Sequence, residues 1–203
     1  TTNTTSFFRE PHQFEYLAGT ALPELLKRHR DDRRLRIWSA GCSSGQEPYT
    51  IAMVVREIVK PESGFDAKIL ATDLDSDILA RAKEGIYREE DLEPVSRERR
   101  ARFFQKGDGP HAGKVRVAQE LRDLITFNRL NFMHDWPMRG PFDCIFFRNV
   151  AIYFEKPTQE MLIERFAEKL APCGWLFVGH SESLLHSAHL LELCGRGVYR
   201  RRA

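Results

Sequence analysis

Two polar loops that follow apolar runs carry residue types suited to holding a small ligand. The string SAGCSSGQEPYT follows LRIW and places Gly41 and Gly45 in a G-x-x-x-G turn. The string ATDLD places Asp73 at the end of a second apolar run. Glycines let backbone amides approach a ligand closely, and a carboxylate can accept two hydroxyl hydrogen bonds. Together the loops predict a ligand that contains a ribose.

The glycine loop also argues against some ligands. It is not a G-x-G-x-x-G dinucleotide fingerprint, and no G-K-[ST] makes it a phosphate loop. A pyrophosphate is therefore disfavoured, and a nucleoside without phosphates, such as S-adenosylmethionine, fits better. Two alternatives stay open. The loop could be a plain tight turn, and helix capping could explain the acids, more readily for Asp75 than for Asp73.

No other catalytic arrangement is evident. No Ser-His-Asp or Cys-His set stands out, and no His/Cys/Asp cluster has metal-ligand spacing, so we expect no metal. Cys42, Cys144, Cys173 and Cys194 are far apart and include no C-x-x-C pair. This cysteine usage argues against a zinc site or disulfides and for a reducing cytosol.

Alternating strands and helices must position these loops. Their order predicts an α/β fold with a mostly parallel sheet covered on both faces, in which ligands bind at the carboxyl ends of the strands. The expected strands are RLRIWSA, AKILATDLD, a strand within FDCIFFRNVAIYF, and GWLFVGH. The expected helices are EPYTIAMVVREIVK, SDILARAKEG with Gly85 as its stop, and TQEMLIERFAEKLAPCG, ended by Pro172 and Gly174.

Two regions depart from this alternation. The opening stretch FFREPHQFEYLAGTALPELLKRH looks helical, and Phe7 and Phe8 are expected in the core rather than on a ligand. The middle, roughly residues 93–128, contains a charged helix, the glycine-rich GDGPHAG and the alternating KVRV. This pattern predicts hairpins, and hence a small antiparallel insert.

Composition limits the class of protein. The 203 residues are 42% hydrophobic and 30% charged, which suits one globular domain. No apolar run approaches the roughly 20 residues that span a bilayer, so we expect no insertion into a membrane. The net charge of +2 does not call for nucleic acid. The basic clusters are expected to be solvated faces, with docking of an acidic partner as the alternative.

Read together, five strings resemble the CheR-type glutamate methyltransferases that act on chemotaxis receptors, over nearly the whole chain: NTTSFFRE, SAGCSSGQEPY, ATDLD, FRNVAIYF and GHSESL. The resemblance implies a Rossmann-like class I S-adenosylmethionine-dependent methyltransferase fold. Residues 1–203 would be the catalytic domain and 93–128 its β-subdomain. Members usually carry an N-terminal helical domain as well, whereas this sequence opens directly on the N-x-T motif.

The same resemblance implies the reaction and its partners. S-adenosyl-L-methionine would methylate glutamate side chains on the cytoplasmic helical bundle of a chemoreceptor, leaving S-adenosyl-L-homocysteine. The insert resembles members that dock a receptor's C-terminal peptide. A cytoplasmic monomer is expected.

Site residues are assigned by the same resemblance. Arg9 and Tyr153 would act near the transferred methyl. Glu47 takes the cofactor role in the glycine loop, because Gln46 stands where many members have Glu. The cofactor residues are Asn3, Thr5, Arg9, Glu47, Asp73, Asn131, Phe132, Arg148 and Asn149.

The chemistry of carboxyl methylation agrees with the lack of an evident general base. A glutamate with a pKa near 4.3 is already ionised at neutral pH, so no general base is needed to create the nucleophile. The enzyme then has chiefly to place the carboxylate in line with the methyl group and sulfur. Arg9 and Tyr153 are therefore expected to orient the acceptor. The alternatives are a surface ion pair for Arg9 and a core position beside Phe154 for Tyr153. His180 could line the acceptor channel or be structural.

Two other functions stay open. One is methyl transfer to a different acceptor, although RNVAIY lacks the Asn/Asp-Pro-Pro-Tyr end typical of amide or amine acceptors. The other is a module that binds S-adenosylmethionine or docks a peptide without catalysis.

Overall fold

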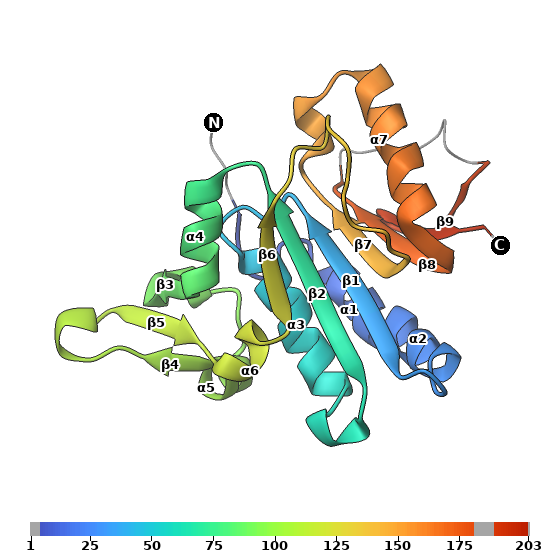
Figure 1. The fold of residues 1–203 in the computed structure, drawn as a ribbon. Coiled ribbons are helices and arrows are strands. Elements are labelled where there is room, and N and C mark those ends of the chain that lie inside the picture. Colours follow the sequence, from blue (N-terminus) through green and yellow to red (C-terminus); the bar gives the residue numbers. More distant parts are fainter. Residues whose placement is uncertain (1–4, 181–188, 203) are drawn as a thin grey trace.

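A mixed sheet of seven strands forms the centre of the molecule (Figure 1). The computed structural model describes residues 5–180 and 189–202. Five neighbouring strands are parallel, and only the pairings of β10 are antiparallel. In spatial order the strands are β6 (Ile125–Arg129), β2 (Asp66–Asp73), β1 (Arg34–Ala40), β7 (Phe142–Phe147), β8 (Leu170–Val178), β10 (Val198–Arg201) and β9 (Leu191–Gly195).

Helices cover both faces of this sheet, so the predicted fold class is confirmed. On one face, α3 packs with α1, η1 and α2 against alternate side chains such as Ile37 and Phe146. On the other, α7 packs against Trp38 and Phe147. This two-sided burial explains why every residue of β7 is buried. The helices are α1 (Pro11–Tyr16), π-helix η1 (Leu17–Ala21), α2 (Leu22–Arg28), α3 (Gln46–Ile58), α4 (Ser76–Glu84) and α7 (Lys156–Lys169).

The opening helix begins later than its sequence suggests. It starts at Pro11, a first-turn position that proline tolerates because its missing N–H needs no partner there. Phe7 and Phe8 precede it in a turn, yet both are buried, which confirms the core prediction. The wider turn of η1 directly precedes α2, whose second residue is Pro23. Pro23 has no backbone N–H and cannot donate the usual hydrogen bond to the residue four positions earlier. The wider π turn that precedes it is consistent with this missing bond.

The predicted end of the last long helix is wrong. Helix α7 stops at Lys169, and β8 already begins at Leu170, so Pro172 and Gly174 belong to the strand. Cys173 between them has a left-handed φ of 58°, and the β7–β8 register shifts beside it. Proline is tolerated near the start of a strand, beside a bulge, because no backbone N–H is needed there to pair with a neighbouring strand. Pro172 and Gly174 therefore do not mark the end of a helix.

A small three-stranded antiparallel sheet is present, but the boundaries 93–128 are wrong at both ends. The sheet starts upstream, because β3 (Ile86–Arg88) pairs with β5. At the other end, β6 pairs in parallel with β2 and belongs to the main sheet. The remaining elements of this region are 3-10 helix η3 (Glu89–Leu92), α5 (Arg97–Phe103), β4 (Phe104–Lys106), 3-10 helix η4 (Gly109–His111), β5 (Lys114–Val117) and α6 (Gln119–Arg122).

The C-terminal hairpin of β9 and β10 was not predicted. Its strands are short, and only Leu191 and Val198 are buried in them, so the sequence carries little alternation. Two short 3-10 turns complete the described elements: η2 (Pro61–Ser63) and η5 (Ala151–Tyr153). No helix in the ranges 5–180 and 189–202 combines the length and apolar character needed to cross a bilayer.

Candidate functional site

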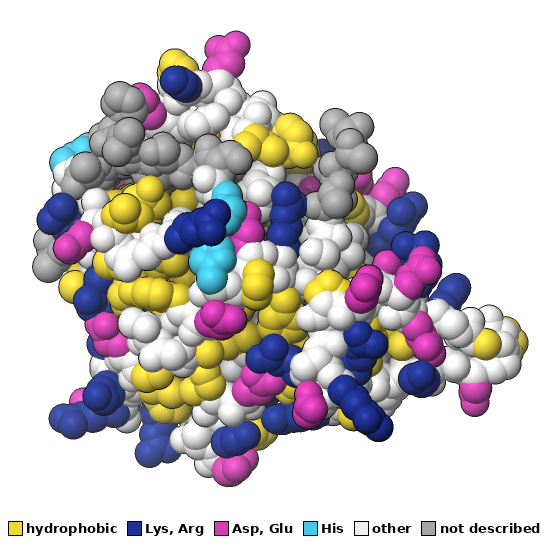
Figure 2. Space-filling model, turned by 180° about the vertical axis from the view of Figure 1, so that it is seen from behind, with side chains coloured by type: hydrophobic (Ala, Val, Ile, Leu, Met, Phe, Trp, Pro, Cys, Tyr) yellow, Lys and Arg dark blue, Asp and Glu magenta, His cyan; other side chains and the backbone are white. Residues whose placement is uncertain are grey.

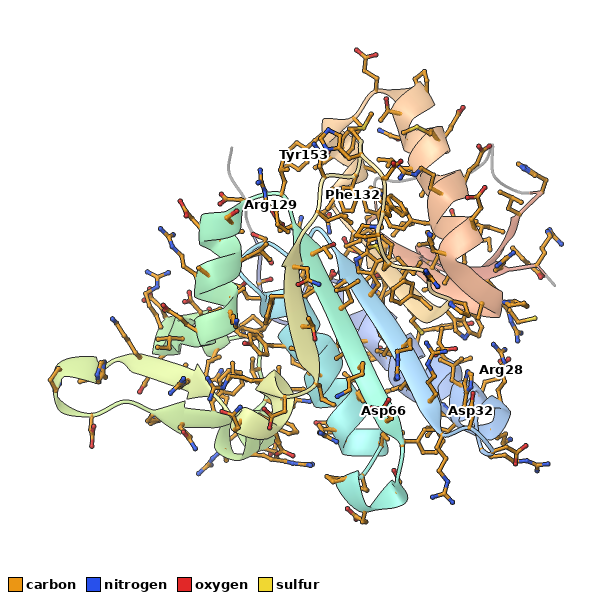
Figure 3. All side chains as sticks on the ribbon, in the orientation of Figure 1. Arg28, Asp32, Asp66, Arg129, Phe132 and Tyr153 are labelled. Atoms are coloured by element: carbon orange, nitrogen blue, oxygen red, sulfur yellow. The ribbon has the colours of Figure 1, made fainter. Side chains whose placement is uncertain are left out.

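A cavity of about 640 Å³ lies where β1, β2, β6 and β7 end. Figure 3 shows Phe132 and Tyr153 beyond the carboxyl ends of β1 and β2, whereas Asp32 and Asp66 lie at the opposite end of the sheet. Ligands of open parallel sheets bind at this carboxyl edge. Among the predicted site residues, those that line the cavity are Thr5, Arg9, Glu47, Asp73, Asn131, Phe132, Arg148, Asn149 and Tyr153. Asn3 lies outside the described residues.

The glycines after β1 shape the loop in different ways. Both have left-handed backbones, with φ of 83° at Gly41 and 96° at Gly45. A Cβ on Gly41 would meet the Val150 side chain at 2.5 Å, and one on Gly45 would meet the Tyr87 hydroxyl at 2.8 Å. Gly41 lines the cavity, whereas Gly45 does not. Gly45 therefore allows close packing beneath the loop, at the start of α3. It does not contact the cavity, so it is not a ligand contact.

Asp73 connects the two predicted loops. One carboxylate oxygen accepts the Ser43 amide at 2.8 Å, and the other accepts the Asp75 amide at 3.1 Å. Each oxygen keeps a second lone pair for a ligand, because a carboxylate offers about four acceptor positions. Asp75 instead caps α4, accepting the Asp77 and Ile78 amides, as expected. Capping is thus the role of Asp75, and Asp73 lines the cavity.

Arg148 is a buried cation that ties three segments together. Its side chain is 2% exposed, and it reaches Glu47 at 3.3 Å and Glu10 at 3.5 Å. It also donates to the carbonyl oxygen of Arg9. The other oxygen of Glu47 accepts the Ser39 hydroxyl at 2.7 Å. Removing one partner of such a buried pair typically costs about 3–5 kcal/mol, so this network holds the N-terminal turn against the cavity.

Two polar atoms in the cavity wall have no partner among the described residues. They are the Ser43 hydroxyl and Nε of Arg148, both buried. A buried donor without a partner carries a desolvation cost of about 1–3 kcal/mol. Both atoms lie on residues that face the cavity, so a ligand with hydrogen-bond acceptors would satisfy them.

Asn131, Phe132 and Asn149 come from loops that follow β6 and β7. Asn131 accepts the Met133 amide at 2.9 Å, which fixes its loop. Phe132 is 8% exposed and packs edge-on against Phe147. Asn149 has a left-handed φ of 59°, a conformation that asparagine tolerates better than most residues. The backbone therefore turns sharply at the end of β7 and carries Tyr153 to the cavity mouth.

Large apolar side chains surround that mouth. Tyr153 is 59% exposed, so the alternative of a core position beside Phe154 is wrong. Leu74, Met133 and Ile152 are each more than half exposed and also line the cavity. An apolar rim around a cavity that carries polar groups in its wall suits a second molecule that presents one polar group to the cavity.

Several residues that line the cavity are not among the predicted site residues. Ser6, Cys42, Ser43 and Ile152 line the cavity, and all lie inside the quoted strings, so position within a string was the available signal. His180 does not line it, so the acceptor-channel alternative is wrong. Burial raises the pKa of the Cys42 thiol well above its usual range, and the nearby carboxylates of Asp73 and Glu47 add to this. Cys42 is therefore a neutral wall residue.

Comparison with known proteins identifies the family of this chain. Residues 3–199 match the family model described as "CheR methyltransferase, SAM binding domain". The chain is 47% identical to Chemotaxis protein methyltransferase 2 of Pseudomonas aeruginosa over 202 residues, covering 98% of this chain and 70% of that protein. It is 42% identical to the Chemotaxis protein methyltransferase of Escherichia coli K12 over 200 residues, covering 98% and 67%.

A solved structure supports the fold alone. The DszA carbon methyltransferase has a TM-score of 0.51 at 16% identity, covering 83% of this chain and 35% of that one. The family match covers almost all of the present sequence, and its model is a domain that binds S-adenosylmethionine. The chain therefore belongs to the CheR methyltransferase family and is an S-adenosylmethionine-dependent methyltransferase.

Proposed function

We propose that this enzyme transfers the methyl group of S-adenosylmethionine to glutamate side chains on the cytoplasmic domains of chemoreceptors. The products are a glutamate methyl ester and S-adenosyl-L-homocysteine. The observation that carries the proposal is the cavity itself, which has polar groups in its wall and an exposed tyrosine at its mouth. The names of the relatives supply the chemotaxis context.

The residues of the cavity fit this cofactor. Asp73 has spare acceptor capacity for the two ribose hydroxyls. The unpartnered donors on Ser43 and Arg148 suit a carboxylate, which is an acceptor group of S-adenosylmethionine. Thr5, Asn131 and Asn149 add further polar side chains to the wall. When bound, the cofactor supplies a methyl group on a positively charged sulfur.

The chain's own contribution is placement. A glutamate acceptor is already a carboxylate at neutral pH, so no residue has to remove its proton. Charge on the reacting groups falls during transfer, so a strong ion pair to the acceptor would stabilise the ground state more than the transition state. We assign Arg9 and Tyr153 to orienting the acceptor, the hydroxyl of Tyr153 by a single hydrogen bond.

The apolar rim offers a contact surface for the acceptor protein. Leu74, Met133 and Ile152 are exposed around the mouth, and Tyr153 stands among them. A receptor helix that presents a glutamate between apolar residues would bury this rim while its carboxylate enters the cavity. Water is then excluded from the transfer, which favours fixed contacts with the acceptor.

The small antiparallel sheet offers a second contact for the receptor. A hollow of about 560 Å³ lies between η3, α5 and the sheet. Its floor is apolar, with Leu92, Phe104 and Val115, and its rim carries Arg97 and Lys106. This combination suits the C-terminal peptide of a receptor, which ends in a carboxylate. We propose docking of that tail here, by a cytoplasmic enzyme that acts as a monomer.

Methylation assays with purified receptor cytoplasmic domains test the proposal. Incubation with methyl-tritiated S-adenosylmethionine should transfer label that mild base releases as methanol, because an ester hydrolyses under conditions that leave N-methyl groups intact. Base-stable label would overturn the glutamate assignment. Calorimetry with S-adenosyl-L-homocysteine separates a failure of cofactor binding from a failure to recognise the receptor.

A further inference from the structure

Two histidines and a glutamate from distant parts of the chain meet beside the cofactor cavity. Glu10 and His12 lie at the start of α1, and His180 lies just beyond β8. One possible ligand atom from each of the three lies within 4.8 Å of the others. The rings of His12 and His180 are nearly parallel, with centroids 5.2 Å apart. Figure 2 shows histidine side chains gathered on this face, next to Lys or Arg and acidic side chains.

The backbone directs Glu10 into this cluster. Its φ of 58° and ψ of 65° are left-handed, which is unusual for a glutamate. One carboxylate oxygen lies 3.5 Å from the His180 amide. The other is buried and accepts no hydrogen bond among the described residues, although Arg148 lies 3.5 Å away. This oxygen is ion-paired with Arg148 but makes no hydrogen bond within the described part of the chain, so its lone pairs leave room for a metal ion as a further ligand.

His12 is also oriented by a neighbour. Its Nε2 lies 3.2 Å from the carbonyl oxygen of Arg196. When Nε2 carries the proton and donates it to this carbonyl, Nδ1 is left with a free lone pair. Histidine ligands of metals typically donate their other N–H to a backbone carbonyl or a carboxylate in this way. In that tautomer, Nδ1 of His12 can serve as the metal ligand.

We propose that Glu10, His12 and His180 form a binding site for a divalent transition-metal ion of the Zn²⁺ class. Two imidazoles and one carboxylate are a donor set that zinc accepts, with the fourth position open to water. Tetrahedral zinc with ligands at about 2.0–2.2 Å would place them about 3.4 Å apart. Rotation of an exposed side chain such as His180 can close the remaining gap. This site lies outside the cofactor cavity, since neither histidine lines it.

The bound ion would connect the N-terminal turn to the end of β8. Arg9, which precedes Glu10, lines the cofactor cavity, and Arg148 contacts both Glu10 and Glu47. An ion on Glu10 would thus sit one residue from the cavity wall and share a carboxylate with its buried cation. Metal binding by these three residues does not depend on which acceptor the enzyme methylates.

Competition of the full chain with a fluorescent zinc chelator measures the affinity directly. We expect one equivalent of Zn²⁺ to bind, and His12→Ala or His180→Ala to weaken binding by roughly tenfold or more. Glu10→Gln removes the anionic ligand and should weaken it as well.

His111→Ala is the matched control, because His111 is an exposed histidine on η4 in the small sheet region. Its affinity for zinc should equal that of the parent chain. Circular dichroism of each variant establishes that it is folded, and His180→Ala, at an exposed position, is the variant least expected to disturb folding. Unchanged affinity in folded His180→Ala, or an equal loss in His111→Ala, would overturn the site.

Discussion

The cofactor cavity and the hollow on the small sheet are built in opposite ways. The cavity gathers residues from Thr5 to Phe154, and its central cation, Arg148, is buried between two carboxylates. The hollow is lined only by residues between Glu89 and Val115. Its cations are exposed, Lys106 pairing with Glu89 at 3.4 Å. One site is assembled by the whole fold and the other by a single local segment.

Under the proposed function, this difference would separate the methyl transfer in the cavity from receptor recognition in the hollow. Buried charges that are held by several partners keep their positions, and misplacing them is costly. Transfer between a fixed donor and a carboxylate needs such positioning. Exposed charges contribute little to stability, but they guide and select a partner. We therefore expect changes in the cavity to affect all substrates, and changes in the hollow to affect only those that carry a docking tail.

The largest effect is expected from Asp73→Asn. Asparagine keeps one acceptor for the Ser43 amide but puts a donor in place of the oxygen that accepts the Asp75 amide. That donor would also face the ribose hydroxyls if the cofactor binds as proposed. Losing charge-assisted hydrogen bonds to two hydroxyls should lower the affinity for S-adenosyl-L-homocysteine by about 100-fold, measured by calorimetry. Asp75→Asn is the matched control, because asparagine caps a helix as well as aspartate does. An affinity within threefold of the parent would contradict the assignment of Asp73.

Tyr153→Phe should come next in size. It removes the hydroxyl proposed to orient the acceptor, so kcat should fall by roughly tenfold. Affinity for S-adenosyl-L-homocysteine should stay within about twofold, since the hydroxyl is not assigned to the cofactor. Tyr199→Phe, on β10 and outside the cavity, controls for the loss of a hydroxyl elsewhere. Arg9→Ala tests the second orienting residue in the same assay, and normal turnover in both variants would remove these roles.

Charge reversal in the hollow should have a selective effect. Arg97→Glu combined with Lys106→Glu should raise KM by about tenfold for a receptor domain with its C-terminal tail, because like charges repel the terminal carboxylate. The same domain without its last residues should show no change. Arg81→Glu with Lys83→Glu on α4 alters the net charge equally at another exposed place. An equal loss with both receptor forms would mean that the hollow does not dock the tail.

The smallest effect concerns how firmly the small sheet region is attached. Arg99 on α5 makes two hydrogen bonds to Glu57 on α3, at 2.8 and 2.9 Å, and lies over the Phe8 ring at 4.4 Å. The pKa of Arg99 is raised chiefly by this contact with Glu57. A double-mutant cycle with Arg99→Ala and Glu57→Ala in urea unfolding should give a coupling energy of about 1 kcal/mol. No measurable coupling would mean that apolar packing alone holds α5.

Local patterns in the sequence determined the central strands, the start of α4 and the loops that carry the site. Burial on both faces makes most positions of β1 and β7 apolar, and Asp75 caps α4 through its own neighbours, so no distant residue is needed to predict them. The strings SAGCSSGQEPY, ATDLD and FRNVAIYF lie at the carboxyl ends of β1, β2 and β7. Because parallel strands end at one edge, the cavity residues could be expected together.

Only the tertiary structure decided which partners distant segments take. Residues 125–129 alternate equally well for a hairpin or for a parallel edge strand, and pairing with β2 made the choice. The sequence assigns Arg148 to the cofactor site only by resemblance, and its pairing with Glu10 becomes evident only when the N-terminal turn is placed beside it. The cluster of Glu10, His12 and His180 has no spacing to recognise along the chain, because its members meet only when β8 ends beside α1. Periodicity reports which face of an element is buried, whereas contacts between elements depend on how the whole chain packs.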